Sequence, residues 1–518
     1  MKFTMKYILF ITLVQVTWCV VCSYRILMTF TTPAKSHYNI GMAIAKSLVD
    51  AGNDVTVISS YRENNLIDGK YRNIFLEGLV EKWFEILKID EDSTSVFDLV
   101  NQSPFENNRF LIELGFIMAN LTIEHSAFKE FLKSNGTFDV VILEELYSDA
   151  LKSLGCHFNA PVIGFSAGAP NAWVNSAIGN PWPPSYVPDV NAGFQYPMNI
   201  WERFWNTAAI VYRDLSFHIV HIPQQNALMK KHFPHCPDLS IVAYNVSLFF
   251  LNGHESYSQP MPYFPNMINI GGIHMKSEQK LPQGLQDFMD NATKGVVYFS
   301  MGTFLNVSKM TSDVKQIFIN VFKNIDVQVL WKWDNERLFG LSRNVKLGKW
   351  FPQQAVLAHP NLKVFITHAG IGSIMEAVRY GVPILTLPVF ADQNSNAVYA
   401  EHLGYAINIP FKNIDEKKLL RALNDLLNNS KYREKARERS ALFMDRPMKP
   451  NDSVVYWTEF VIRNRGASHL RVASVDMPYY EYFLIDIIVY LIFTISVIFL
   501  CLHFIIKRLV IRMKLKQA

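Results

Sequence analysis

Short apolar runs alternate with amphipathic stretches through most of this chain. Residues 24–31 form an apolar run, and residues 40–51 place apolar side chains at helical spacing. Residues 54–59 form a second apolar run. This order predicts a strand, a helix and a strand, which is the βαβ unit of a parallel sheet. Two further buried strands of the same sheet are predicted at 138–143 and 161–165.

A second series of the same kind occupies the later part of the chain. The pattern predicts an α/β protein with two doubly wound halves. The Pro- and Gly-rich stretch 259–284 separates them, so we expect a first domain at 24–260 and a second at 261–450. The second half has predicted strands at 295–300, 327–331, 363–367, 383–387 and 406–409, with helices at 312–323, 372–380 and 416–427.

The N-terminus has the pattern of a secretory signal. Lys2 and Lys6 precede an apolar run at 7–21, and the small residues Cys22 and Ser23 follow it. A positive start, a short apolar run and a small-residue cleavage point predict a signal peptide at 1–23. A buried first strand or a retained anchor is the alternative.

A second apolar segment lies near the C-terminus. Residues 483–506 are long enough to cross ~30 Å of hydrocarbon as a helix, and three tyrosines shortly before them resemble an interfacial aromatic belt. The segment 507–518 is basic, which predicts a cytosolic tail and lumenal domains. The residues between, 451–482, are expected to hold a return helix and a juxtamembrane segment.

The net charge narrows the choice of partners. Fifty Lys and Arg residues against 45 Asp and Glu give a net charge of +5, and the basic tail holds the whole excess. No folded face with Lys and Arg clusters is apparent, so nucleic acid is excluded as a partner. Lys514 and Lys516 resemble a dilysine retrieval signal, which predicts a single-pass type I protein of the endoplasmic reticulum membrane. A plain stop-transfer cluster is the alternative.

Cysteines and glycosylation sequons fit a lumenal location. Cys156 and Cys236 lie between the signal and the apolar span, and they could pair in an oxidising compartment. Two cysteines do not make a disulfide framework. Sequons for N-glycosylation occur at Asn120, Asn135, Asn245, Asn291, Asn306 and Asn428.

A glycine-rich turn in the second half predicts an anion site. His368, Gly370 and Ser373 follow a predicted buried strand and open a helix. The glycines allow a close approach of the backbone, and the helix N-terminus favours negative charge. A diphosphate is the natural guest. The pattern is neither the dinucleotide fingerprint nor a P-loop with its lysine.

A histidine in the first half is a candidate general base. His37 follows the first strand at the start of the first helix, where the helix N-terminus favours its neutral form. Glu144 and Glu145 end a strand of the same sheet, and either could orient the imidazole. A structural histidine is the alternative. The acidic run 90–92 matches the DxD pattern of metal-dependent glycosyltransferases, but no buried strand delivers it, so we interpret it as a solvated turn.

Several of these motifs together resemble a known family. The stretch 350–397, which contains WFPQQ and THAGIGS, closely resembles the signature of UDP-glycosyltransferases. VVYFSMGT, INIGGIH at 268–274 and YWTEFVIRNRGASHLR at 456–471 support the resemblance. From signal to basic tail, the chain is similar to the insect membrane-bound members.

The resemblance implies the GT-B fold, in which two Rossmann-like domains face each other across a cleft. The acceptor would bind to the first domain and a UDP-sugar co-substrate to the second, with no other cofactor and no metal. His37 would be the base and Glu144 its partner. The implied donor-site residues are Trp350 on uracil, Gln353 on the nucleoside, Glu376 on the ribose, Ser300, Thr303, His368, Gly370 and Ser373 on the diphosphate, and Asp392 and Gln393 on the sugar.

Three positions depart from the family pattern. The usual HGG contains Ala369, Gly372 stands where vertebrate relatives often have Asn, and Glu144 stands where they carry Asp. A glutamate keeps the charge but is one methylene longer.

The sequence thus predicts an inverting UDP-glycosyltransferase. The expected reaction moves a hexose, for which the insect resemblance favours glucose, to a hydroxyl of a small lipophilic acceptor, as in detoxification. Transfer to a membrane lipid of the sphingolipid type and an inactive lumenal carrier are the alternatives. The sequence leaves the acceptor and homo-oligomer formation open.

Overall fold

The computed structural model describes residues 23–517 except 64–68, 88–96, 98–101, 135, 277–279, 304, 306 and 336–337. Nearly all of the predicted signal, the acidic run 90–92 and the sequons at Asn135 and Asn306 lie outside the described residues. The chain divides into two compact units, residues 1–470 and residues 471–518.

The first unit contains two sheets in which every recorded strand pair is parallel. The first sheet has the order β3-β2-β1-β4-β5-β6-β7, and the second has the order β10-β9-β8-β11-β12-β13. In each sheet the order reverses between two neighbouring strands, β1 and β4 in the first and β8 and β11 in the second. These two places are topological switch points, where ligands bind in open α/β sheets.

The strands have the following bounds. The first sheet contains β1 (Arg25–Phe30), β2 (Asp54–Ser59), β3 (Tyr71–Phe75), β4 (Val140–Glu144), β5 (Val162–Ser166), β6 (Leu248–Leu251) and β7 (Met267–Asn269). The second contains β8 (Val296–Ser300), β9 (Gln328–Lys332), β10 (Val345–Gly348), β11 (Leu362–Thr367), β12 (Ile384–Thr386) and β13 (Ala406–Asn408).

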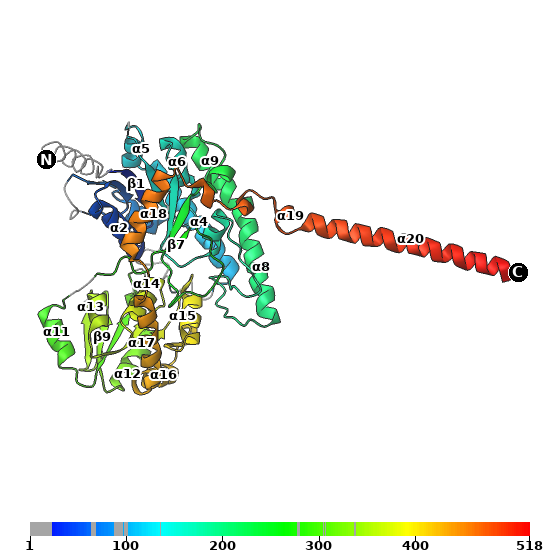
Figure 1. The fold of residues 1–518 in the computed structure, drawn as a ribbon. Coiled ribbons are helices and arrows are strands. Elements are labelled where there is room, and N and C mark those ends of the chain that lie inside the picture. Colours follow the sequence, from blue (N-terminus) through cyan, green and yellow to red (C-terminus); the bar gives the residue numbers. More distant parts are fainter. Residues whose placement is uncertain are drawn as a thin grey trace, which may run out of the picture. The chain divides into compact units, whose positions relative to one another are not determined.

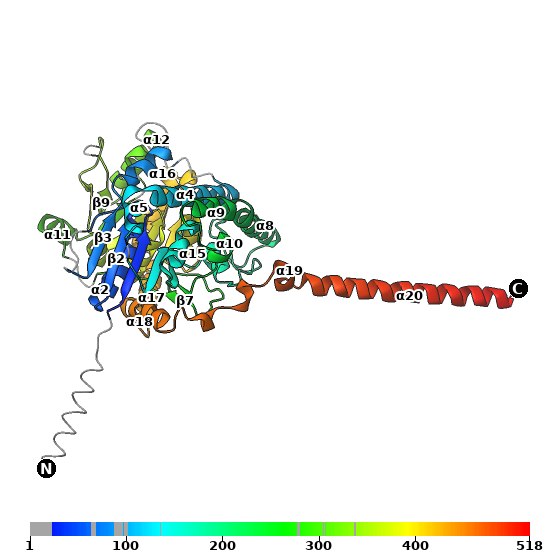
Figure 2. The same ribbon diagram turned by 90° about the horizontal axis from the view of Figure 1, so that it is seen from above.

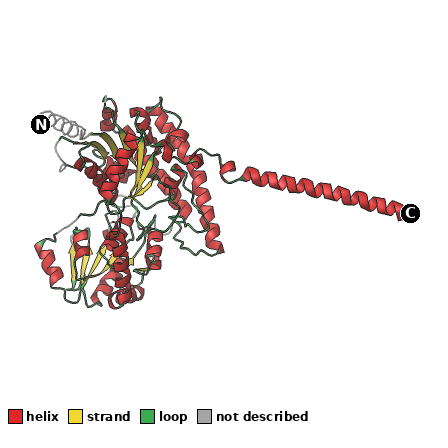
Figure 3. Ribbon diagram, in the orientation of Figure 1, coloured by secondary structure: helices red, strands yellow, loops and turns green. Residues whose placement is uncertain are grey.

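Helices flank the strands of both sheets (Figure 3). In the first half these are α2 (Lys35–Asp50), α3 (Leu79–Ile86), α4 (Pro104–Glu124), α5 (Ser126–Leu132), η2 (Asp149–Lys152), α6 (Ser153–Phe158), α7 (Ala172–Ala177), α8 (Ile200–Ser216), the π-helical η3 (Phe217–His221), α9 (Ile222–His232) and α10 (Leu239–Val242). Later come α11 (Gln283–Asp290), η4 (Val307–Lys309), α12 (Ser312–Lys323), α13 (Gln353–Ala358), α14 (Ile371–Arg379), α15 (Gln393–His402), η5 (Phe411–Asn413), α16 (Glu416–Asn428), α17 (Ser430–Met444), α18 (Pro450–Arg463), η6 (Ser468–Leu470), η7 (Ala473–Val475), α19 (Tyr479–Tyr482) and α20 (Ile485–Gln517).

Both faces of each sheet are covered, which explains why the strands read as continuous apolar runs. Alternate residues of β4 belong to different cores, Val141 with α4 and α5 and Ile142 with α2 and α18. In β8, Phe299 packs towards α12 and Tyr298 towards α14 in the same way. Burial of each such side chain contributes about 1.5–3 kcal/mol, so the two sheets form rigid platforms for the loops at their edges.

The chain crosses from the first half to the second near residue 270 and returns after α17. Helix α18 packs against α2, where Asn451 Nδ2 donates to Ser47 Oγ at 2.8 Å (Figures 1 and 2). The two crossings are bonded to each other, because Arg446 donates through Nη1 to the carbonyl oxygen of Gly271 at 2.7 Å.

Several element predictions need correction. Helix α2 begins at Lys35, five residues before the predicted start at 40, so His37 lies in its first turn. Strand β7 belongs to the first sheet although the sequence assigned its residues to the second domain. The sequence reading also missed β3, β6 and β10. The domain limits themselves remain a prediction.

The second unit contains the long helix α20. Among the described residues, one helix, Ile485–Lys516, is long and apolar enough to cross a membrane. The expected span 483–506 lies almost entirely within it. The helix continues into the basic segment, which the sequence reading treated as a separate tail.

A disulfide joins Cys156 of α6 to Cys236, with the two cysteines 80 residues apart. We expect the double variant Cys156→Ser/Cys236→Ser to lose about 2–5 kcal/mol of unfolding free energy, because the bond restricts a long loop in the unfolded chain. Denaturant unfolding of the solubilised protein measures this loss. Cys501→Ser, at the exposed free cysteine, is the matched control and should change nothing. Equal stability of the double variant and the control would contradict the prediction.

Candidate active site

The switch point of the first sheet brings a histidine and a carboxylate together. His37 lies in the first turn of α2, just beyond β1, and Glu144 is the last residue of β4, which pairs directly with β1. The His37 Nδ1 atom is 2.6 Å from Glu144 Oε1. The His37 side chain is 29% exposed, whereas the Glu144 side chain is 5% exposed. Glu144 thus binds Nδ1 of the imidazole, and Nε2 remains available to a reactant.

The environment raises the pKa of His37. Burial lowers this pKa, but the hydrogen bond and negative charge of Glu144, together with the charge of Asp392, outweigh that effect. The helix N-terminus, from which the sequence predicts a neutral imidazole, is therefore not the dominant influence on this pKa. The structure also separates the two candidate partners, since Glu145 pairs with Lys152 Nζ at 2.8 Å and not with His37.

Asp392 comes from the second half of the unit and is close enough to His37 for each charge to affect the other's pKa. Burial raises the pKa of Asp392, opposed by a hydrogen bond from Asn396 Nδ2 at 2.8 Å and by His37. Asn396 Nδ2 also donates to the carbonyl oxygen of Ala369 at 3.1 Å, which ties α15 to the turn after β11. The site therefore draws on both halves.

At the switch point of the second sheet, the turns after β8 and β11 are tightly packed and lie close to a lysine. A Cβ atom on Gly302 would lie 2.6 Å from His368 Cε1, and one on Gly370 would lie 2.4 Å from His368 Nε2. Only glycine fits at these two positions. Lys332 at the end of β9 donates to the carbonyl oxygen of Gly302 at 2.9 Å. Burial and the charge of Lys332 lower the pKa of His368 to about 4, so the imidazole is neutral at pH 7.

The donors around this turn suit an anion. Ser300 is buried at the end of β8, where its Oγ accepts from Gly302 N at 3.4 Å, and Thr303 is exposed in the same loop. Gly370 precedes the first residue of α14, whose N-terminus offers free N–H groups. The Ser373 side chain lies in the first turn of that helix and is mostly buried.

The structure shows the local backbone and space at two of the positions that depart from the family pattern. Ala369 has a φ of +64°, in the left-handed region that favours glycine, so the backbone here adopts the glycine conformation with a methyl group attached. Gly372 has open space around its missing Cβ, so a Cβ atom would fit at this position.

Glu376 on α14 is surrounded by donors. Gln353 Nε2 donates to Oε2 at 2.7 Å and Gln354 Nε2 to Oε1 at 2.9 Å, while His274 Nε2 is 3.4 Å from Oε1. Burial raises the pKa of Glu376, but these neighbours outweigh burial and lower it overall. The carboxylate stays ionised, and Oε2, which has Gln353 as its donor, keeps a lone pair for a ligand hydroxyl.

The remaining predicted residues complete the same edge of the sheet. Trp350 follows β10 and is 66% exposed, so its ring is available for stacking. The Gln393 side chain is buried, and its Oε1 accepts from the backbone N–H groups of Val389 and Phe390 at 2.9 and 3.3 Å. Only its amide N–H₂ group remains for a ligand.

Sequence reasoning missed four participants. Gln354 and His274 contact Glu376, and Asn396 contacts Asp392. Lys332 bonds to Gly302, and its charge acts on His368. Lys332 ends an apolar strand and Gln354 adjoins Gln353, so position in the pattern could have indicated both. His274 closes the INIGGIH segment, which the sequence reading used only as support for the resemblance.

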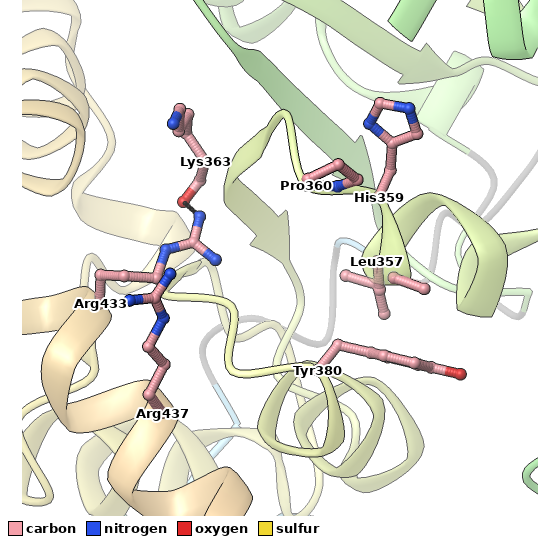
Figure 4. A pocket seen from close by; sticks show the side chains of 8 residues that line it. Leu357, His359, Pro360, Lys363, Tyr380, Arg433 and Arg437 are labelled. Atoms are coloured by element: carbon pink, nitrogen blue, oxygen red, sulfur yellow. Dashed lines mark hydrogen bonds between the residues drawn. The ribbon is translucent and has the colours of Figure 1, made fainter. Parts of the chain in front are cut away.

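Two other features lie apart from this site. A cavity of about 270 Å³ in the second half contains none of the predicted site residues (Figure 4). It is lined by Leu357, Ala358, His359, Pro360, Lys363, Tyr380, Arg433 and Arg437. Among the described residues, one group of three potential metal ligands comprises Cys156, His235 and Cys236, whose two sulfurs are bonded to each other.

Comparison with known proteins identifies the family. A model of the family described as UDP-glucoronosyl and UDP-glucosyl transferase matches residues 34–517. The chain belongs to the UDP-glycosyltransferase family. It is 33% identical to UDP-glycosyltransferase UGT5 of Dactylopius coccus over 489 residues, covering 94% of this chain and 92% of the relative. It is 32% identical to human UDP-glucuronosyltransferase 2B7, covering 71% of this chain and 70% of the relative.

Solved structures support the fold of this glycosyltransferase. The glycosyltransferase VinC in complex with dTDP matches with a TM-score of 0.57 at 17% identity, covering 85% of this chain and all of that one. The glycosyltransferase of kitacinnamycin matches with a TM-score of 0.55 at the same identity and coverage of this chain. The predicted GT-B fold and the predicted family are confirmed.

Proposed function

We propose that this glycosyltransferase transfers a hexose, glucose in the first place, from a UDP-sugar to a hydroxyl of a small lipophilic acceptor with inversion at the anomeric carbon. The observation that supports this most strongly is the His37–Glu144 pair at 2.6 Å with Asp392 facing it from the other half. A base on one side and a sugar-holding carboxylate on the other suit a transfer between two bound substrates.

In the proposed reaction, His37 Nε2 accepts the proton of the acceptor hydroxyl as its oxygen attacks the anomeric carbon. The bond from that carbon to the β-phosphate oxygen breaks, and UDP departs with the electron pair. Glu144 stabilises the imidazolium that forms. The N-terminus of α14, His368 and the Ser300–Thr303 loop stabilise the leaving diphosphate, so the step relies on positioning and electrostatics, and we propose that it needs no metal.

The proposed donor contacts follow the geometry of the second sheet. Trp350 stacks on uracil, Gln353 contacts the nucleoside, and Glu376 accepts hydrogen bonds from the ribose hydroxyls. Ser300, Thr303, His368, Gly370 and Ser373 surround the diphosphate, while Asp392 and Gln393 bind the sugar hydroxyls. The exposed indole of Trp350 and the ionised Glu376 carboxylate support the first and third of these assignments.

A lipophilic acceptor is supported by the surface of α8. Ile200, Trp201, Phe204 and Trp205 are each more than half exposed. This exposure favours a membrane-facing surface over the wall of an acceptor pocket or ordinary core. In a chain that also carries a membrane-spanning helix, such a surface suits acceptors that partition into a bilayer. We place the enzyme in the endoplasmic reticulum membrane with its sheets on the lumenal side.

A donor panel tests the proposal. Solubilised full-length protein is incubated with UDP-glucose, UDP-glucuronic acid, UDP-galactose or UDP-N-acetylglucosamine and a mixed set of phenols, and released UDP is measured. We expect release with UDP-glucose only when an acceptor is present. Release with another sugar would correct the donor. If the protein binds a donor tightly but releases no UDP with either phenols or sphingolipid acceptors, the proposed enzymatic activity would be contradicted. A carrier function would then be favoured.

The pH dependence of transfer tests the role of Glu144. His37 must be neutral to accept a proton, so kcat/KM rises as the pH passes the pKa of His37. Glu144 raises that pKa. Glu144→Gln should therefore move the acid limb of the pH profile to lower pH by about one unit and reduce kcat. An acid limb at its original pH would contradict this role. Glu145→Gln is the matched control at the neighbouring carboxylate.

A further inference from the structure

Four buried ionisable side chains form a cluster that begins at Glu145, the residue after Glu144. Lys152 Nζ lies 2.8 Å from Glu145 Oε2 and 2.6 Å from Asp149 Oδ1, and His221 Nε2 lies 2.6 Å from Asp149 Oδ2. None of these four residues, which we refer to as the Lys152 cluster, is more than 6% exposed. Lys152 Nζ also donates to the carbonyl oxygen of Ala243 at 3.0 Å.

Such a cluster is expensive to bury. Each charge loses its hydration, and well-packed apolar side chains of the same size are often as stabilising or more so. Burial raises the pKa of the Glu145 carboxyl, partly offset by the charge of Lys152. The proposed reaction uses none of these groups. Stability alone therefore gives little reason for the cluster to be here.

The cluster is connected to the catalytic pair through the backbone. Glu145 follows Glu144 directly, and their side chains point to different partners, Lys152 and His37. Two adjacent carboxylates at a strand end would otherwise compete for the same cation or repel each other, and Glu144 is among the charges that act on Glu145. Lys152 gives Glu145 a partner of its own, which leaves Glu144 to His37.

Side-chain hydrogen bonds also hold the turn that follows β4. Gln225 of α9 accepts from Ala150 N at 3.0 Å and donates to the carbonyl oxygen of Tyr147 at 2.8 Å. Tyr147 itself has a φ of +54°, and its hydroxyl donates to Asn108 of α4 at 3.1 Å. The π-helical turn η3 carries His221 to Asp149. Helix α4 and the continuous segment formed by η3 and α9 thus converge on one turn.

We propose that the Lys152 cluster is a positioning unit that holds the end of β4 so that the Glu144 carboxylate stays on His37. The inference rests on the proposed role of His37 as the base. In the proposed reaction, the members of the Lys152 cluster touch no substrate. They act through Glu144, and a displacement of about 1 Å in such a pair costs on the order of 10²-fold in rate.

The sign of a pH shift tests the proposal. The charged groups that face His37 are Glu144 from β4 and Asp392 from the loop before α15. If Lys152→Met lets Glu144 move away, burial dominates and the acid limb of kcat/KM moves to lower pH. If the lysine acts only through its charge, removing a cation moves the acid limb to higher pH. We expect the acid limb to move to lower pH, with kcat reduced by at least ~10-fold and the affinity for UDP unchanged.

Matched variants separate positioning from stability. Glu145→Leu should behave as Lys152→Met does, while Glu145→Gln keeps an acceptor for Lys152 Nζ and should retain the original acid limb. Arg213→Met removes another buried ion pair of the same half, with Asp189, which holds a different loop and should leave the acid limb in place.

The outcomes decide between the possibilities. An acid limb that stays or rises in Lys152→Met and Glu145→Leu, with UDP binding retained, would overturn the proposal. Loss of UDP binding in both would show that the cluster supports the fold as a whole, which also overturns it. A fully active His37→Ala protein would instead disprove the proposed base, and no acid limb could then be assigned to it.

Discussion

His37→Ala should reduce transfer by about 10²–10⁴-fold, because the acceptor hydroxyl loses the group that takes its proton. His37 interacts with Asp392, which is assigned to the sugar, and the residues assigned to UDP belong to the second half, so UDP should bind to the variant as it does to the native protein. UDP release measures the first effect, and calorimetric titration of solubilised protein with UDP measures the second. The split between lost turnover and retained binding identifies a catalytic residue.

A histidine elsewhere provides the control. His232 of α9 is also paired with a glutamate, its Nε2 lying 2.9 Å from Glu124 Oε1, but it is not at a switch point. His232→Ala should leave transfer unchanged. Full activity of His37→Ala would contradict the proposed mechanism, and loss of activity together with UDP binding would indicate a structural histidine.

Glu376→Ala should weaken UDP binding by roughly 30-fold or more, since hydrogen bonds to a charged acceptor contribute about 1.5–3 kcal/mol each. The variant also leaves the amide groups of Gln353 and Gln354 without their acceptor. If Glu376 binds the ribose hydroxyls, the native protein should prefer UDP over 2′-deoxy-UDP. The variant should bind both equally weakly, which titration with the two nucleotides measures.

Selectivity makes this prediction specific. A general loss of structure would weaken the binding of both nucleotides and leave the ratio of their affinities unchanged. Glu401 of α15 provides a control, because it also accepts a hydrogen bond, from Asn408 N at 2.9 Å, but lies outside the site. A Glu376→Ala protein that still prefers UDP over its deoxy form would contradict the ribose assignment.

The sequence predicted those elements whose apolar pattern is unambiguous. Strand β2 and helix α12 have their predicted bounds because apolar runs and helical spacing are strong there. Strand β10 was missed because its residues are half-exposed and carry no apolar run, and β7 because three residues are too few to show a period. Strand β6 is an apolar run, LFFL, that the reading overlooked.

The candidate site was predictable where chemistry is tied to strand ends. His37 and Glu144 could be brought together because parallel strands end at the same edge, and their adjacency is now supported by a distance. The strand ends alone left Glu144 and Glu145 open, and only the resemblance favoured Glu144, because the pairing depends on Lys152, which binds Glu145. The electrostatic interaction between His37 and Asp392 depends on the packing of two halves, which no local pattern encodes.

The double crossing between the halves restricts how they can move. Two connections joined by the hydrogen bond from Arg446 to Gly271 would restrict a relative motion of the halves more than one connection would. A motion that kept this hydrogen bond would be a rotation about the point where the two connections meet. Such a rotation would bring Asp392 back to the same place near His37 each time the halves came together.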